Sequence, residues 1–103
     1  MSYVLPRNVT SPKSSVRNVN VLLDKGEWLF SIASLEWMEN GKFEPRIGIR
    51  WNGCDTPGVK GSSKGTPHSR GYPTWFILPK EIALAYAESI GNIKMKKIIE
   101  LAK

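Results

Sequence analysis

RIGIRWNG, residues 46–53, alternates apolar and polar side chains along its length. Ile47, Ile49 and Trp51 take the odd positions, whereas two arginines and a glycine take even ones. A period of two is typical of a β-strand with one apolar face, because successive side chains of a strand point to opposite sides of the sheet. The stretch therefore predicts a strand that buries its odd positions and presents two arginines on the other face.

Two further strands precede this one. VRNVNVLLD, residues 16–24, alternates valine and leucine with polar side chains, and EWLFSIASLEWM, residues 27–38, is a longer apolar and aromatic run. Lys25–Gly26 and Asn40–Gly41 separate the three segments, and both pairs are typical of tight hairpin turns. Short connections of this kind predict that neighbouring strands run antiparallel.

The second predicted strand changes its apolar face halfway along. Its even positions are apolar from residue 28 to residue 32, whereas Leu35 and Trp37 occupy odd positions. A strand that exchanges faces usually contains a β-bulge, where one extra residue bends it. We therefore expect a bulge near residues 33–34 and a curved sheet.

A segment rich in Gly, Ser, Pro and Lys, residues 53–73, follows the third strand and is too long for an ordinary connection. TWFIL, residues 74–78, predicts a fourth strand, and Pro79 suits the first turn of a helix. Apolar residues then recur at helical spacing to the end of the chain. The sequence predicts an α+β fold, in which a four-stranded curved antiparallel sheet precedes one long C-terminal helix (β-β-β-β-α).

The 103 residues suit one domain. We expect it to span residues 16–103, after a flexible arm of residues 1–15 that is rich in Ser, Pro and Asn. The 15 Lys and Arg exceed the 9 Asp and Glu, and the net charge of +6 favours a polyanionic partner. One cysteine, no secretory pattern and no apolar run of membrane-spanning length favour a cytoplasmic or nucleoid-associated protein without a membrane partner.

Motifs for catalysis or metal binding are sparse. The chain has one His and one Cys, whereas a metal site needs three or four ligands at set spacing. Cys54, Asp55 and His68 could act as nucleophile, orienter and base, but the Gly-rich segment would hold them poorly. We therefore expect no enzyme, no metal and no organic cofactor.

The arginine face carries the functional prediction. One helix can cover only one face of the sheet, which leaves the arginines on the other face with aromatic residues beside them. Exposed aromatic side chains next to cations form a platform on which unpaired bases stack with little sequence preference, whereas a duplex would need a helix or ribbon for its groove. The candidate nucleic-acid-binding residues are Arg46 and Arg50 for phosphates, Lys42, Lys60, Lys64 and Arg70 for an extended basic track, and Trp37 or Phe76 for stacking.

EPRIGIRWNG, residues 44–53, and YPTWFILPKEIALAYAE, residues 72–88, together with the strand order, resemble the positive-cofactor-four-like fold. Its members are small single-stranded-DNA-binding proteins, found as transcriptional coactivators and as bacterial relatives. The resemblance covers residues 19–90 and departs from the family in the expanded connection before the last strand. It implies single-stranded DNA, ahead of RNA, as the ligand in transcription, replication or DNA transfer. It also implies that Trp51 lies in or near the DNA-binding strand and that the helix joins a homodimer.

A second hypothesis belongs to another class. The chain could be a small protein-binding module or inhibitor, of the kind that phages and mobile elements encode. It would dock on its partner through the Trp-rich sheet or the helix. The sequence leaves this alternative open.

Overall fold

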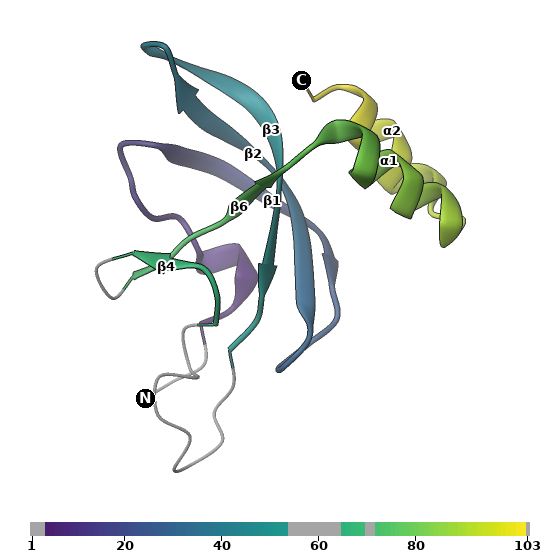
Figure 1. The fold of residues 1–103 in the computed structure, drawn as a ribbon, viewed down its shortest axis with the longest axis horizontal. Helices are drawn as coiled ribbons and strands as arrows, with labels where there is room; N and C mark the ends of the chain where they lie inside the picture. Colours follow the sequence, from purple (N-terminus) through teal and green to yellow (C-terminus); the bar gives the residue numbers. More distant parts are fainter. Residues whose placement is uncertain (1–3, 54–64, 70–71, 103) are drawn as a thin grey trace.

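The computed structural model describes residues 4–53, 65–69 and 72–102. Its elements, in chain order, are the 3-10 helix η1 (Pro6–Asn8), the strands β1 (Val16–Asp24), β2 (Phe30–Glu39), β3 (Lys42–Trp51), β4 (His68–Ser69), β5 (Tyr72–Pro73) and β6 (Phe76–Leu78), and the helices α1 (Lys80–Ser89) and α2 (Ile93–Glu100). Four strands form an antiparallel sheet in the order β1-β2-β3-β6, and β4 pairs with β5. The two helices pack side by side against this sheet (Figure 1). The predicted α+β class and four-stranded antiparallel sheet are confirmed.

The hairpin between β2 and β3 has the turn that the sequence predicts. Asn40 and Gly41 are its two loop residues, and their φ angles of 49° and 84° are both positive. Two positive φ angles are typical of a type I′ turn, whose twist matches that of the flanking strands. β2 and β3 then pair along their full lengths without a register shift.

The two-residue turn predicted between β1 and β2 is wrong, because the connection spans residues 25–29. A polar cluster at the end of β1 holds this wider connection. Asp24 Oδ1 accepts a hydrogen bond from the Gly26 N–H at 2.9 Å and another from Asn52 Nδ2 at 3.2 Å. Trp28, inside the connection, has a φ of 66°, so the chain turns where the sequence predicted the start of a strand.

The single long C-terminal helix is also wrong, because Gly91 and Asn92 divide it into α1 and α2. Gly91 has a φ of 67°, a conformation that favours glycine. Its N–H donates to Glu88 O, and the Asn92 N–H donates to Ala87 O, which together form a Schellman motif at the end of α1. The Asn92 side chain then accepts the Met95 N–H at 3.0 Å and caps α2.

Each face of the sheet has its own hydrophobic core. On the helix side, Ile32 of β2 and Ile47 of β3 pack against buried residues of α1 and α2. On the other side, Ala33 and Leu35 of β2 pack with Trp75, which precedes β6. The two halves of β2 are therefore buried on opposite faces, and this arrangement explains the change of apolar parity.

The β-bulge predicted in β2 is wrong, because β2 pairs with β3 without a shift and the irregularities lie in β1. β1 shifts its register against β2 at two places, and Asn18, with a φ of 54°, lies in the first. Bulges at an edge strand increase its twist and discourage pairing with another chain.

Part of the segment predicted to form an arm outside the domain, with Val4, Pro6 and Val9, packs against the sheet. Val9 is fully buried in the second core together with Val16. The indole Nε1 of Trp75 donates a hydrogen bond to Val9 O at 2.8 Å. The folded unit therefore includes residues before position 16, and they help to close the face opposite the helices.

Candidate functional site

The arginine face is closed, contrary to the prediction that it is open. Arg50 is only 2% exposed, because the chain before β6 packs over it. Its guanidinium donates to Thr74 O and, at 3.4 Å, to Pro67 O, and Cζ lies 5.9 Å from the ring centre of Trp75. The expectation that Arg50 offers an exposed cation is therefore wrong, and the guanidinium instead ties this segment to β3.

Arg46 and Lys42 pair with carboxylates. Arg46 Nη2 lies 2.6 Å from Glu39 Oε2, and the Arg46 side chain is largely buried. Lys42 Nζ lies 3.4 Å from Glu44 Oε1 and stays exposed. Lys42 and Trp51 are the two ends of β3, which a strand of this length separates by about 30 Å. The structure therefore does not bring Lys42 together with the exposed aromatic residues described below.

The other predicted residues of the basic track cannot be placed. Lys60, Lys64 and Arg70 lie outside the described residues.

Trp37, predicted to stack on bases, is half-buried and packs against the second core. It therefore contributes to packing on the arginine side of the sheet.

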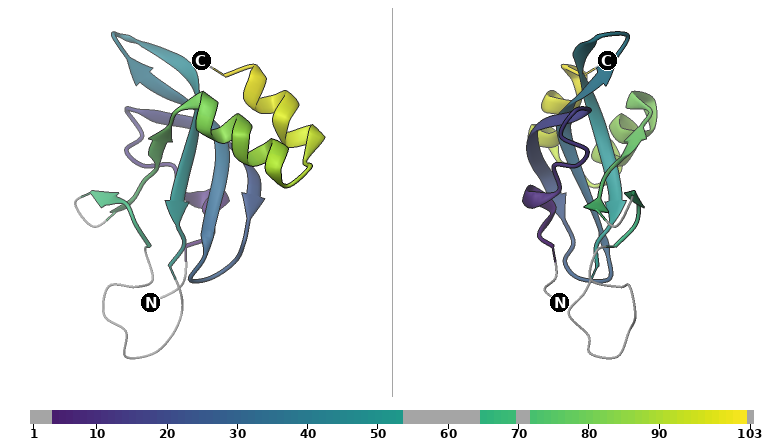
Figure 2. Two further views of the ribbon diagram at one scale, coloured as in Figure 1. Left: turned by 45° about the vertical axis from the view of Figure 1, so that its right-hand side comes forward. Right: turned by 90° about the vertical axis from the view of Figure 1, so that its left-hand side faces the viewer.

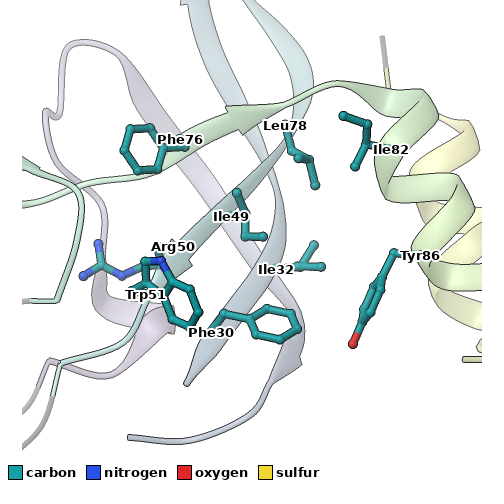
Figure 3. A pocket seen from close by; sticks show the side chains of 9 residues that line it. All are labelled: Phe30, Ile32, Ile49, Arg50, Trp51, Phe76, Leu78, Ile82 and Tyr86. Atoms are coloured by element: carbon teal, nitrogen blue, oxygen red, sulfur yellow. The ribbon is translucent and has the colours of Figure 1, made fainter. Parts of the chain in front are cut away.

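A groove opens on the helix side, between the sheet and α1, with a volume of about 350 Å³. We call it the aromatic groove (Figure 3). Its lining is almost wholly hydrocarbon, because the guanidinium of its one charged residue, Arg50, points away from the centre of the groove. The lining residues are Phe30, Ile32, Ile49, Arg50, Trp51, Phe76, Leu78, Ile82 and Tyr86.

Three aromatic rings organise the groove. The Phe30 ring centre lies 6.3 Å from that of Trp51, with 84° between the planes, and 5.8 Å from that of Tyr86, with 69° between the planes. Both pairs are edge-to-face contacts, the arrangement that the ring quadrupoles favour. Trp51 and Tyr86 lie on opposite sides of Phe30 (Figure 3), so the groove has an aromatic wall on each side.

The rim of the groove is exposed because the helices cover only part of the sheet (Figure 2). Trp51 is 55% exposed, Phe76 53% and Ile82 56%. Phe76 pairs with Ile49 of β3, and both lie on the helix side of the sheet, like Trp51. Large apolar side chains gathered in this way on the surface of a small protein are typical of a binding site.

The structure brings together two of the predicted site residues, Trp51 and Phe76, but on the face opposite the arginine side chains. The prediction from parity that the helix buries Trp51 is wrong, because Trp51 lies on the side of the groove away from α1 and is exposed (Figure 3). Phe30, Ile82 and Tyr86 were not among the predicted site residues. The Asn40–Gly41 turn did carry a signal for Phe30, since it sets the register that places this residue opposite Trp51.

Comparison of the chain with protein-family models, with curated proteins and with solved structures found no match. Among the described residues, no His, Cys, Asp and Glu side chains gather in a group of three that could hold a metal ion. No helix in the described ranges has the length and apolar character needed to cross a membrane. Cys54 and Asp55 of the nucleophile hypothesis fall outside these ranges.

Proposed function

We propose that the protein binds single-stranded nucleic acid, DNA ahead of RNA, with unpaired bases stacked in the aromatic groove. The observation that carries this proposal is the exposure of more than half of Trp51 and of Phe76 beside the partly buried ring of Phe30. Aromatic rings presented by a sheet bind the faces of unpaired bases, and each stacked base contributes about 1–3 kcal/mol. A duplex hides those faces, so the single strand is the preferred ligand.

Charge supports the same ligand. The chain carries a net charge of +6, which attracts a polyanion. Trp51 and Thr66 exchange two backbone hydrogen bonds, at 2.8 and 3.0 Å. Thr66 is therefore held beside Trp51, and the sequence between these two residues contains Lys60 and Lys64. These lysines replace Arg46 and Arg50 as our candidates for phosphate contacts.

The proposal is tested by fluorescence anisotropy of labelled oligo-dT, its RNA equivalent and a matching duplex across a salt series. We expect oligo-dT to bind most tightly, with log K falling against log salt by about 0.7 per phosphate contacted. Trp51→Ala and Phe76→Ala should each weaken binding roughly 5- to 150-fold, the loss of one stacked base. Trp28→Ala and Tyr72→Ala are matched controls, because both residues are exposed aromatics that do not line the groove.

Two outcomes would contradict the proposal. One is the absence of strand binding at low salt. The other is binding that both groove variants retain at full strength, because the strand would then occupy another surface. Circular dichroism of each variant checks that the fold is intact.

A second function, docking of a protein partner, is favoured by the nearly complete lack of polar atoms in the groove. Such a lining suits aliphatic or aromatic side chains of a partner. A photo-crosslinking amino acid at position 82, on the exposed rim, would report on this function. A discrete protein adduct, lost when Trp51 is changed to Ala, together with no strand binding, would favour docking.

A homodimer remains a prediction. Ile93 and Leu101 of the helical hairpin are 69% and 81% exposed and offer apolar surface for a second copy. Sedimentation equilibrium should show a dimer that Ile93→Glu converts to a monomer. A monomer at all concentrations would contradict the expectation.

A further inference from the structure

We infer that the aromatic groove holds an unpaired base through its faces and apolar surface alone, without reading its hydrogen-bonding edge. This inference rests on the proposed function, because it specifies how the groove takes its ligand. The chemical class is a planar, neutral nucleobase that enters from a charged strand outside. On this inference, the groove does not distinguish one base from another by the hydrogen-bond donors and acceptors on the edge of the base.

The first support is the scarcity of polar groups in the described lining. Eight of the nine lining residues have aromatic or aliphatic side chains, whose polar groups are the Tyr86 hydroxyl and the Trp51 indole N–H. The ninth, Arg50, uses its guanidinium for the carbonyl oxygens of Thr74 and Pro67 on the opposite side of the sheet. Arg50 therefore borders the groove without offering its charge to a ligand.

The second support is the arrangement of the rings. Trp51 stands at 84° to Phe30, and Tyr86 stands at 69° to the same ring from the other side (Figure 3). A planar group that enters the groove meets these three rings, which all belong to its lining. Aromatic pairs in such geometries are more favourable than their buried area alone implies.

The third support is charge complementarity. The groove lining is uncharged in its interior, whereas the whole chain carries a net charge of +6. A nucleotide is divided in the same way, because its neutral base suits the uncharged groove and its anionic phosphate suits the positively charged protein. A base whose polar edge were buried in this groove would lose hydrogen bonds to water without replacement, so the edge must remain directed to solvent.

A substituted strand tests the inference directly. Three labelled oligonucleotides with the same backbone carry thymine, the apolar isostere 2,4-difluorotoluene, or abasic residues at the same positions. We expect the full-length protein to bind the difluorotoluene strand at least as tightly as the thymine strand. The abasic strand should bind roughly 5- to 150-fold more weakly per stacked base lost. In Trp51→Ala the difference between base-bearing and abasic strands should largely disappear, whereas in Trp28→Ala it should persist.

The outcomes separate this inference from the proposed function. If the thymine strand binds but the difluorotoluene strand is as weak as the abasic one, edge hydrogen bonds hold the base and the inference is overturned alone. If the abasic strand binds as tightly as the others, the groove takes no base and the inference is again overturned. If no strand binds, the proposed function fails and this inference fails with it.

Discussion

At the scale of single residues, Arg50 has the most unusual environment in the described part of the molecule. It is a buried cation, and the hydrogen-bond acceptors that we identify for it are main-chain carbonyl oxygens of Pro67 and Thr74. Because a guanidinium carries several donors, one arginine can hydrogen-bond both of these carbonyl oxygens at once and hold their segment against β3. Arg50 is therefore a structural residue.

Replacing Arg50 tests this assignment. Arg50→Leu leaves carbonyl oxygens on Thr74 and Pro67 without their donor, so we expect the free energy of unfolding to fall by roughly 3 kcal/mol. Urea denaturation measures the loss, with the exposed Lys42→Ala as a control that should change by less than about 0.5 kcal/mol. The salt dependence of strand binding should not change. A stable Arg50→Leu protein with a flatter salt slope would instead make Arg50 a phosphate ligand.

Glu36 shows how one side chain stabilises an irregular strand. A hydrogen bond from Asn18, and then one from Arg17, lower the pKa of the Glu36 carboxyl. Because this pKa is lower in the folded than in the unfolded chain, ionised Glu36 stabilises the fold above its unfolded pKa. That contribution is lost as the pH falls through the folded pKa.

Asn18→Gly should raise the pKa of Glu36, since it removes the hydrogen bond and tolerates the positive φ at this position. NMR titration of the side-chain carboxyl carbon measures the change. Asn20→Gly, on the same strand, is the control and should leave this pKa where it is. An unchanged titration in Asn18→Gly would show that Arg17 alone sets the value.

The alternation of side chains along a strand predicts which face a residue lies on, but not what covers that face. It placed Arg46 and Arg50 on the face opposite Ile47 and Ile49, and the structure confirms that placement. It could not show what covers that face. The chain that covers it comes from near Val9 and from the segment before β6, which are both distant from β3 in sequence. Neither segment has a periodic pattern from which its place on the sheet could be predicted.

At the scale of elements, the turn at residues 40–41 sets the register of the whole β2–β3 ladder. A two-residue turn at 40–41 pairs Glu39 with Lys42, and continuing the ladder puts Phe30 opposite Trp51. The part of the groove lining that β2 and β3 contribute can therefore be predicted from the register alone. The rest comes from β6 and α1, which lie beyond the long Gly-rich segment, so no local rule sets their position against β3.

The division of the C-terminal helix is a local effect that one residue controls. A Cβ at Gly91 would meet nothing within 4 Å, so substitution there tests only the backbone conformation. Gly91→Ala should lower the free energy of unfolding by about 1 kcal/mol, because an L-residue is disfavoured at a φ of 67°. Thermal and urea unfolding measure the loss, and Ser89→Ala in the last turn of α1 is the control. No loss would mean that the chain passes from α1 to α2 by another conformation.

At the scale of the whole molecule, two cores on opposite faces make the sheet a central layer. The outer layers are α1 with α2 on one side, and the N-terminal segment with Trp75 on the other. The sequence predicts the class and the sheet because strand periodicity and turn residues are local signals. It misses the second outer layer because residues 4–15 lack periodicity and were interpreted by composition.

Deleting residues 1–10 tests the role of this layer. The deletion removes the fully buried Val9 and the acceptor of the Trp75 indole, so the free energy of unfolding should fall by roughly 3 kcal/mol or more. Tryptophan emission should also shift to the red as Trp75 meets water. Val9→Ala should show a smaller loss in the same direction, and the exposed Thr10→Ala should show none. Unchanged stability in the deletion would restore the interpretation of this segment as an arm.

The paired backbone hydrogen bonds between Trp51 and Thr66 have a consequence for how this protein can be changed. They hold residues 51 and 66 together, and closing a flexible loop costs only about 0.6 kcal/mol more for each doubling of its length. An insertion between residues 51 and 66 that keeps this pair should therefore lower the free energy of unfolding only slightly, and urea denaturation would measure the change.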